Sequence, residues 1–363
     1  MVDNKENWGV VPSSTRRTLV KASAAALVGP FIWIPKSRAA SRLFVRTPGG
    51  AYDDIRREVV YEPFRQKTGI EVVPVASNMS KLFAMFKTGR SELDVVDTSD
   101  SALLQLASTG AFAPIPYQKF KFSRPDNIDL AYRSEYVAGT FVYAAVMAYN
   151  TSAFAKGAAP ENWRDFWNIS RFPGARMLAD MASGSADLEF ALLADGVPRD
   201  KLYPIDIDRA LRSLTELRPS IRKFWDSGAL ASQMIADREV TAGSIWNDRA
   251  ENVIEKGAPI ALGWNDHMVL QQAMSIAKNS KNMDAAIQFV DFCLSTEIQR
   301  NFSLRYTCGP VDRVAHNSLP PSLIAKVPGG DLTSAHGFIR NGRWWADNRA
   351  KVAEQWSKWI VSQ

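Results

Sequence analysis

The chain has few side chains of the kinds that hold metals or act as nucleophiles. Its two cysteines and three histidines are scattered along the sequence: Cys293, Cys308, His267, His316 and His336. A metal site needs such ligands at short, recognisable spacings, so we expect none. In an exported chain the two cysteines could form a disulfide, and two buried free thiols are the alternative. Their spacing leaves both open.

Three aspartates recur at every third position, Asp94, Asp97 and Asp100. An EF-hand would also need a glycine and a distal glutamate, which are absent, so a strand end and a helix cap are the better interpretation. No Gly-x-Gly-x-x-Gly follows a strand, and no Gly-x-Ser-x-Gly elbow occurs. We therefore predict no catalytic residue and no cofactor.

Tryptophans are concentrated in the second half of the chain, where nine of the eleven lie at or after Trp163. Core packing is the commoner role of a tryptophan. This part of the chain has more tryptophans than the core of a small lobe normally needs, and aromatic side chains that line a ligand cleft would account for the additional ones. The cluster in question is Trp225, Trp246, Trp264, Trp344 and Trp345.

The elements that must position these residues alternate between strand and helix. Strands are predicted at 43–46, 70–75 and 93–96, and helices at 52–67, 81–87 and 101–108. Ile55, Val59 and Phe64 lie near one face of the first helix, with Gly69 just past its end as a C-cap. This rhythm predicts an α/β fold with a doubly wound sheet and helices on both of its faces.

The apolar run 137–149 contains β-branched and aromatic residues and is too short to span a membrane. We interpret it as a strand that leads out of a first lobe into a second. Helix and strand signals alternate again from about 150 to 263, most clearly in the helix 208–217 and the strand 242–246.

Residues 1–39 are typical of an export signal. The pair Arg16 and Arg17 precedes the apolar run 22–35, and Ser37-Arg38-Ala39 suits a signal peptidase. The segment around the two arginines is similar to a twin-arginine motif, which directs folded proteins to the bacterial periplasm. We expect cleavage near Ala39, and a retained membrane anchor is the alternative.

The net charge of +6 on 363 residues is mostly a property of this segment. Residues 1–39 hold six basic and two acidic side chains, so removing them leaves +2 on the remainder. A chain this close to neutrality is not expected to bind nucleic acid. At 46% apolar and 23% charged residues, it is expected to be globular rather than disordered.

Segments spread over the chain resemble the extracellular solute-binding proteins of bacterial ABC importers, in the group related to spermidine/putrescine-binding proteins. They are 47–52 (TPGGAY) with 64–72 (FRQKTGIEV), 93–96 (LDVV) with 110–115 (GAFAPI), 162–167 (NWRDFW) with 172–174 (FPG), and 225–228 (WDSG) followed by 239–240 (EV) and 244–247 (SIWN). Each is weak alone, but together they follow the family's order.

The resemblance implies a type II periplasmic-binding-protein fold, with two lobes, a ligand cleft between them and hinge strands. Lobe 1 would comprise 41–145 and about 265–325. Lobe 2 would comprise about 146–263 and about 335–363. Such a receptor would be monomeric and periplasmic, and would deliver a small polar solute to an ABC permease.

The same motifs imply the residues of the cleft. Gly49 and Gly50 would let the backbone approach the ligand, although a tight turn explains them equally well. Thr98 offers a short polar group, and Asp100 could instead cap a helix. The predicted ligand-binding residues are Gly50, Tyr52, Ser99, Asp100, Trp225, Ser227, Trp246, Asn247, Gln272 and Tyr306.

The polyamine group needs carboxylates for its ligands' ammonium ends, and this sequence departs from it. The two acidic positions of the polyamine group align here with Ala186, which lies near Asp187 and Glu189, and with Gln272. The iron-binding relatives use adjacent tyrosines, whereas only Tyr306 is present here. A neutral or zwitterionic solute therefore fits better. The rival interpretation is a periplasmic enzyme exported by the twin-arginine route.

Overall fold

The computed structural model describes residues 42–88, 91–154, 157–330 and 335–362. The predicted export signal at 1–39, with Arg16, Arg17 and the cleavage point near Ala39, lies outside these residues. In the part of the chain that is described, no helix is both long enough and apolar enough to cross a membrane.

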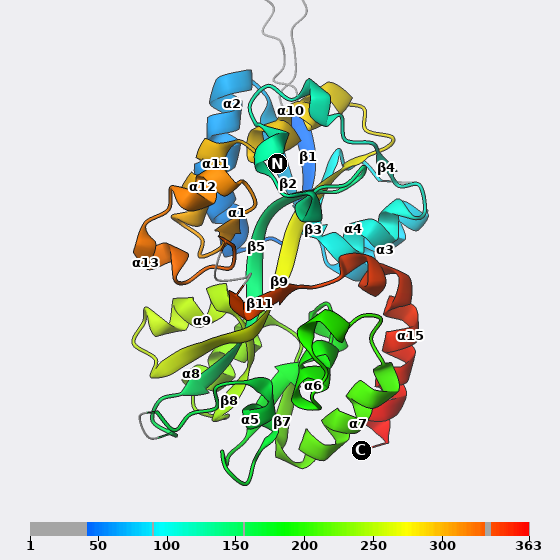
Figure 1. Cartoon of the computed structure of the whole chain (residues 1–363). Coiled ribbons are helices and arrows are strands. Elements are labelled where there is room, and N and C mark those ends of the chain that lie inside the picture. Colours follow the sequence, from blue (N-terminus) through cyan, green and yellow to red (C-terminus); the bar gives the residue numbers. More distant parts are fainter. Residues whose placement is uncertain (1–41, 89–90, 155–156, 331–334, 363) are drawn as a thin grey trace, which may run out of the picture. The chain divides into compact units, whose positions relative to one another are not determined.

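The described strands form an 11-stranded sheet (Figure 1). They are β1 (Arg42–Thr47), β2 (Glu71–Ala76), β3 (Val95–Ser99), β4 (Phe112–Ala113), β5 (Ala138–Asn150), β6 (Arg176–Ala179), β7 (Ile221–Trp225), β8 (Ala242–Trp246), β9 (Ile260–Ala277), β10 (Gly309–Pro310) and β11 (Gly337–Ile339). Along the main path their order is β2-β1-β3-β9-β5-β8-β6-β7.

Helices connect most of these strands. They are α1 (Ala51–Arg56), α2 (Glu62–Thr68), α3 (Met79–Lys87), α4 (Asp100–Ala107), α5 (Trp163–Trp167), α6 (Leu188–Ala194), α7 (Ile207–Leu217), α8 (Gly228–Ala236), α9 (Asn247–Ile254), α10 (Met283–Cys293), α11 (Thr296–Ser303), α12 (Arg313–Asn317), α13 (Pro321–Ile324) and α15 (Gly342–Val361). A π-helical turn, η1 (Arg57–Tyr61), joins α1 to α2.

The long strands β5 and β9 run antiparallel at the middle of the sheet and pair along nearly their whole lengths (Figure 1). On one side β9 pairs with β3, and on the other side β5 pairs with β8. We call the strands β2, β1 and β3 the first half of the sheet, and β8, β6 and β7 the second half. Strands within each half are parallel.

Helices cover both faces of each half, as the alternation of elements predicts. In β3, Val95 packs under α1, α2 and α10, whereas its neighbour Val96 packs under α3 and α4. In β6, Leu178 faces α5, α6, α7 and α15, and Met177 faces α8 and α9. Successive strand residues point to opposite faces, so each half requires a hydrophobic core on both sides.

The predicted helix 52–67 is interrupted by the π-helical turn η1. One extra residue in that turn rotates the helix, so Val60 and Tyr61 enter the core while Ile55 and Val59 stay half-buried. The helix ends at Gly69 in a left-handed conformation, φ 74°, as predicted. The strand predicted at 93–96 instead starts at Val95 and continues to Ser99.

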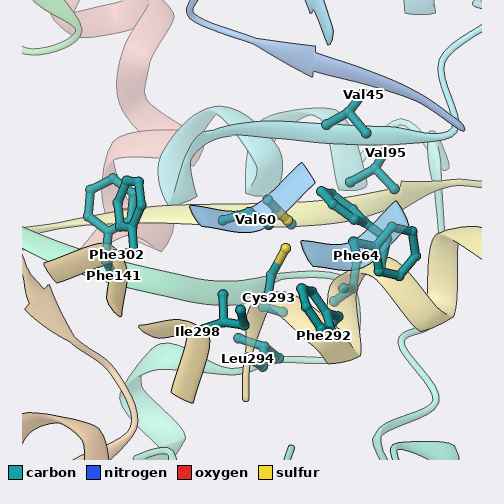
Figure 2. Packing of buried hydrophobic residues seen from close by; sticks show 14 of the residues in the cluster. Val45, Val60, Phe64, Val95, Phe141, Phe292, Cys293, Leu294, Ile298 and Phe302 are labelled. Atoms are coloured by element: carbon teal, nitrogen blue, oxygen red, sulfur yellow. The ribbon is translucent and has the colours of Figure 1, made fainter. Parts of the chain in front are cut away.

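The structure does not join the two cysteines in a disulfide: both are buried free thiols. Cys293 lies at the end of α10 in the apolar cluster that also holds Val60, Phe292 and Ile298 (Figure 2). Its Sγ lies 3.4 Å from the guanidinium of Arg56. Cys308 lies instead 3.6 Å from the hydroxyl of Ser303, so each thiol is held by its own partner.

Candidate functional site

A cavity of about 350 Å³ lies at the carboxyl ends of β1, β3 and β8, against the crossing strands β5 and β9. Ligands of open α/β sheets bind at such strand ends. A larger hollow of about 480 Å³ lies instead against β10 and β11. The smaller cavity is lined by Arg46, Pro48, Gly49, Tyr52, Met79, Thr98, Ser99, Phe141, Tyr143, Ser183, Gly184, Trp246, Asp248, Arg249, Gln272 and Tyr306.

The wall from the first half of the sheet is organised around Asp97, which is fully buried beneath the cavity. Its carboxylate accepts hydrogen bonds from Tyr52 Oη at 2.7 Å and from Gln272 Nε2 at 2.6 Å. Its Oδ2 atom also lies 3.7 Å from Nη2 of Arg56. Burial raises the pKa of Asp97, and the Arg56 guanidinium opposes that shift. Asp97 therefore fixes Tyr52 and Gln272 in place.

Arg46 contributes a buried guanidinium to the same wall, but protein groups already accept its hydrogen bonds. Nη1 donates to the carbonyl of Asp97 at 2.8 Å, and the other nitrogens donate to Ser77. Burial lowers the pKa of Arg46, and the nearby Asp97 carboxylate opposes that shift. Its role in the structure is to hold the β1 and β3 ends together.

The wall from the second half carries the charged groups that remain available. Asp248 lies in the first turn of α9, where its Oδ2 accepts from Tyr306 Oη at 2.7 Å. Its Oδ1 is buried and has no hydrogen-bond partner among the described residues. Arg249 Nε lies 3.4 Å from Asp248 Oδ2, and the Arg249 side chain is 41% exposed. Burial raises the pKa of Asp248, and Arg249 opposes that shift.

Aromatic rings enclose the space between the two walls. Tyr143 meets Trp246 edge-on with ring centroids 5.7 Å apart, and Tyr306 meets Tyr52 in the same way at 5.9 Å. The ring centroid of Phe141 lies 5.8 Å from that of Tyr306. This wall suits methylene groups, and aromatic faces also attract cations. The cavity thus offers a carboxylate and a guanidinium on one wall, with an aromatic surface beside them.

Five of the predicted ligand-binding residues line this cavity: Tyr52, Ser99, Trp246, Gln272 and Tyr306. Tyr52, Ser99 and Gln272 belong to the wall from the first half of the sheet, and Trp246 belongs to the wall from the second half.

Three other predicted residues have structural roles instead. Trp225 is 1% exposed in the core, donates from Nε1 to the carbonyl of Ser244 and packs edge-on beneath Trp246. Ser227 caps α8 by accepting from Leu230 N. Asn247 is buried, and its Oδ1 accepts from Ala144 N. The tryptophan cluster is therefore largely core, with Trp246 its member on the cavity wall.

The remaining two, Gly50 and Asp100, lie beside the cavity but not on its wall. Gly50 precedes α1 with φ 68°, while its neighbour Gly49, φ 86°, does line the cavity. Asp100 is the first residue of α4 rather than its cap, and its carboxylate pairs with Arg340 at 2.9 Å.

Sequence reasoning missed the charged pair Asp248 and Arg249, although they directly follow the predicted Trp246 and Asn247. A strand that ends in the cavity turns there into a helix, so the first helical residues also face the ligand space. The two acids near Ala186 are both used within the fold. Asp187 accepts hydrogen bonds from Ala179 N and Ser244 Oγ, and Glu189 accepts hydrogen bonds from Tyr203 and Trp345. Within the described residues, no group of three or more metal-ligating side chains occurs.

Comparison with known proteins gives relatives for most of the chain. A family model described as bacterial extracellular solute-binding protein matches residues 60–318. The gamma-aminobutyric acid-binding protein of Pseudomonas aeruginosa is 29% identical over 320 residues, which cover 86% of this chain and 89% of that protein.

Solved structures are similar over the same extent. The Atu4243 GABA receptor has a TM-score of 0.80 and 28% identity, and the match covers 88% of this chain and 97% of that one. An ABC transporter substrate-binding protein from Bradyrhizobium japonicum has a TM-score of 0.79 and 29% identity, covering 88% and 99%. The agropinic acid complex of AgtB from A. tumefaciens, at TM-score 0.75 and 24% identity, covers 88% and 99% and shares the fold.

Proposed function

This chain belongs to the bacterial extracellular solute-binding proteins, and from that premise we propose that its ligand is a small amino acid with separate ammonium and carboxylate ends. The function predicted from the resemblance is confirmed: the chain is a substrate-binding protein that captures a small solute for an ABC transporter. The two-lobed α/β fold class is confirmed as well. The likeness to polyamine-binding proteins stays a prediction.

The pair of charged groups at the start of α9 carries the proposal. Asp248 presents a buried oxygen that lacks a hydrogen-bond partner among the described residues, and Arg249 presents a partly exposed guanidinium. A buried carboxylate oxygen in this state is stabilised by an ammonium group. A guanidinium binds a carboxylate in the same way. One ligand with both ends satisfies both groups.

GABA is the first candidate, because two relatives are named for it and because its methylene chain suits the aromatic wall. A diamine would need a carboxylate at each end. Asp97 is already engaged by Tyr52, Gln272 and Arg56. Asp100, which lies beside the cavity, is paired with Arg340. A second ammonium would therefore meet Arg249 instead of an acid, which disfavours polyamines.

Titration calorimetry of the mature protein tests the proposal with four ligands of matched length: GABA, butyrate, butylamine and putrescine. We expect GABA to bind at least tenfold more tightly than the two ligands that lack one end, since a hydrogen bond to a charged group contributes about 1.5–3 kcal/mol. Putrescine binding as tightly as GABA would show that the cavity does not select a carboxylate.

We further propose the lobe boundaries expected from the sequence. Lobe 1 would contain 41–145 and about 265–325, and lobe 2 about 146–263 and about 335–363. The hydrophobic clusters support this division, because one pair packs around the first half of the sheet and the other around the second half and α15. β5 and β9 would be the hinge strands. The rival function, a periplasmic enzyme, requires turnover of the ligand.

The expected location and partners complete the proposal. The family implies a periplasmic protein that works with an ABC permease. Export by the twin-arginine route, cleavage near Ala39 and a monomeric state remain part of the proposal. Mass spectrometry of the protein purified from periplasm would give both the mature N-terminus and, under native conditions, the number of subunits.

A further inference from the structure

Arg340 lies between β11 and α15 with its guanidinium buried. The side chain is 5% exposed. Its backbone N–H donates to the carbonyl of Val269 on β9 at 3.0 Å, so the residue is fixed to a crossing strand. The guanidinium is not on the wall of the cavity.

The two terminal nitrogens of this guanidinium reach different parts of the chain. Nη2 donates to Asp100 Oδ1 at 2.9 Å and to Ser101 Oγ at 3.1 Å. Nη1 donates to Ser185 Oγ at 3.1 Å. One planar group therefore bridges the start of α4 and the loop before α6, which are far apart in sequence.

Both ends of the bridge adjoin the cavity. Ser99, which precedes Asp100, and Gly184, which precedes Ser185, line its wall. Ser99 belongs to the first half of the sheet, whereas the loop that contains Gly184 follows β6 of the second half. Arg340 thus joins wall segments that lie on the two sides of the crossing strands.

Contacts from α15 reinforce the same arrangement. A Cβ atom on Gly342 would come within 2.0 Å of Asp100 Oδ2, so the carboxylate lies directly against the start of this helix. Further along α15, Arg349 donates to the carbonyl of Gly184. The loop on the cavity wall is therefore held by two arginines of the C-terminal segment.

We infer that Arg340 is a positioning residue that holds the Ser99 and Gly184 walls around the bound ligand and slows its release. A buried guanidinium that loses its anionic partner is strongly destabilised, so the two wall segments separate with difficulty while the bridge exists. This inference rests on the proposed function only in its choice of ligand.

Two variants test the bridge against a matched control. Ser185→Ala removes one contact without leaving a charge unpaired, and Arg340→Lys keeps the charge but loses the planar fork. Arg343→Gln is the control, because Arg343 lies in the same segment, is 60% exposed and pairs with Asp347. Each protein is studied by stopped-flow tryptophan fluorescence with GABA, and without ligand by hydrogen exchange.

We expect the GABA dissociation rate to rise about three- to tenfold in Ser185→Ala and further in Arg340→Lys, with the association rate within twofold of the wild type. Amide exchange of residues 183–186 should accelerate in both variants, while the melting temperature stays near that of the control. A residue that only stabilises the fold would instead lower the melting temperature and leave the rate constants unchanged.

Unchanged exchange at 183–186 in both variants would overturn the inference whether or not GABA binds. If the wild type does not bind GABA, the proposed ligand is wrong, and the exchange measurement alone decides the role of Arg340. Equal rate changes in Arg343→Gln would also overturn it, because that side chain is exposed and pairs with Asp347 rather than with the bridge.

Discussion

The two oxygens of Asp248 have different surroundings, and the difference separates binding from folding. Oδ2 accepts from Tyr306, while the buried Oδ1 lacks a partner among the described residues. Asp248→Asn retains an oxygen for Tyr306 but removes the charge. We expect affinity for GABA to fall by roughly 10- to 100-fold, with no comparable loss of stability.

Calorimetry with butyrate provides the control for this variant, because butyrate has no ammonium group and should lose little affinity. The wild type should also bind GABA more weakly as the pH falls through the raised pKa of Asp248, since protonation removes the charge. Asp248→Asn should lack that pH dependence. Equal losses for GABA and butyrate would place the ammonium elsewhere.

Asp187 supplies a second prediction, which concerns stability rather than binding. Burial raises its pKa to about 7, against about 3.9 for an unfolded aspartate. Between these values the folded state holds a proton that the unfolded state has released, so this residue's contribution to stability falls as the pH rises towards 7. Asp187→Asn should remove this pH dependence. The stability of the variant should therefore rise relative to that of the wild type between pH 5 and pH 8.

Urea unfolding at pH 5, 6, 7 and 8 measures this difference. Asp200→Asn is the matched control, since the Asp200 side chain is 75% exposed. Parallel pH profiles for the wild type and Asp187→Asn would mean that Asp187 is already ionised in the folded protein.

Sequence patterns located part of the cavity wall for a clear physical reason. Tyr52, Ser99 and Trp246 lie at or just after strand ends, which local patterns reveal. Asp248 was missed because a charged residue in a first helical turn usually has a simpler explanation in the helix dipole. Trp225 was misplaced because the sequence does not say which of two neighbouring tryptophans lies beneath the other.

At the scale of elements, the turn between β1 and α1 tests how backbone geometry forms the cavity. Gly49 has φ 86°, and a Cβ there would lie 3.0 Å from Ala76 Cβ on the neighbouring strand. Gly49→Ala should therefore lower both stability, by about 1–3 kcal/mol, and GABA affinity. Chemical unfolding and calorimetry measure the two effects.

Gly50→Ala is the matched control, because Gly50 also has a positive φ but nothing lies within 4 Å of its added Cβ. Both variants share the backbone strain. The difference between them in stability and in GABA affinity therefore reports the contact with β2 and the displacement of the wall. Equal affinities in the two variants would show that the Gly49 side of the turn does not shape the site.

Helix and strand types along the chain followed from periodicity, but their details depend on contacts that no local pattern contains. The π-helical turn η1 moves Val60 and Tyr61 into a core formed with α10, more than 200 residues away. β3 extends to Ser99 because β9 pairs with it as far as Gln272. Such long-range pairing sets the ends of elements, which sequence propensity alone does not.

At the scale of the whole molecule, the alternation of elements predicted the α/β class, whereas the pairing of β5 with β9 required the structure. These two strands connect the two halves of the sheet, so a ligand that contacts both walls stabilises the molecule as one unit. The charge balance agrees with a small ligand: the +6 of the full chain becomes +2 once residues 1–39 are set aside. Nothing in that balance requires a polyanionic partner.

Ligand binding without consumption distinguishes a receptor from the rival enzyme. A ligand that binds the folded state stabilises it by about 2.7 kcal/mol at one hundred times its dissociation constant. We therefore expect GABA to raise the melting temperature by several degrees, in a concentration-dependent way, and to be recovered unchanged by NMR after prolonged incubation. Chemical conversion of GABA would indicate an enzyme, because a receptor binds and releases the same molecule. Asp248→Asn provides the control for both measurements, since it should reduce the thermal shift and leave the NMR spectrum of GABA as it was.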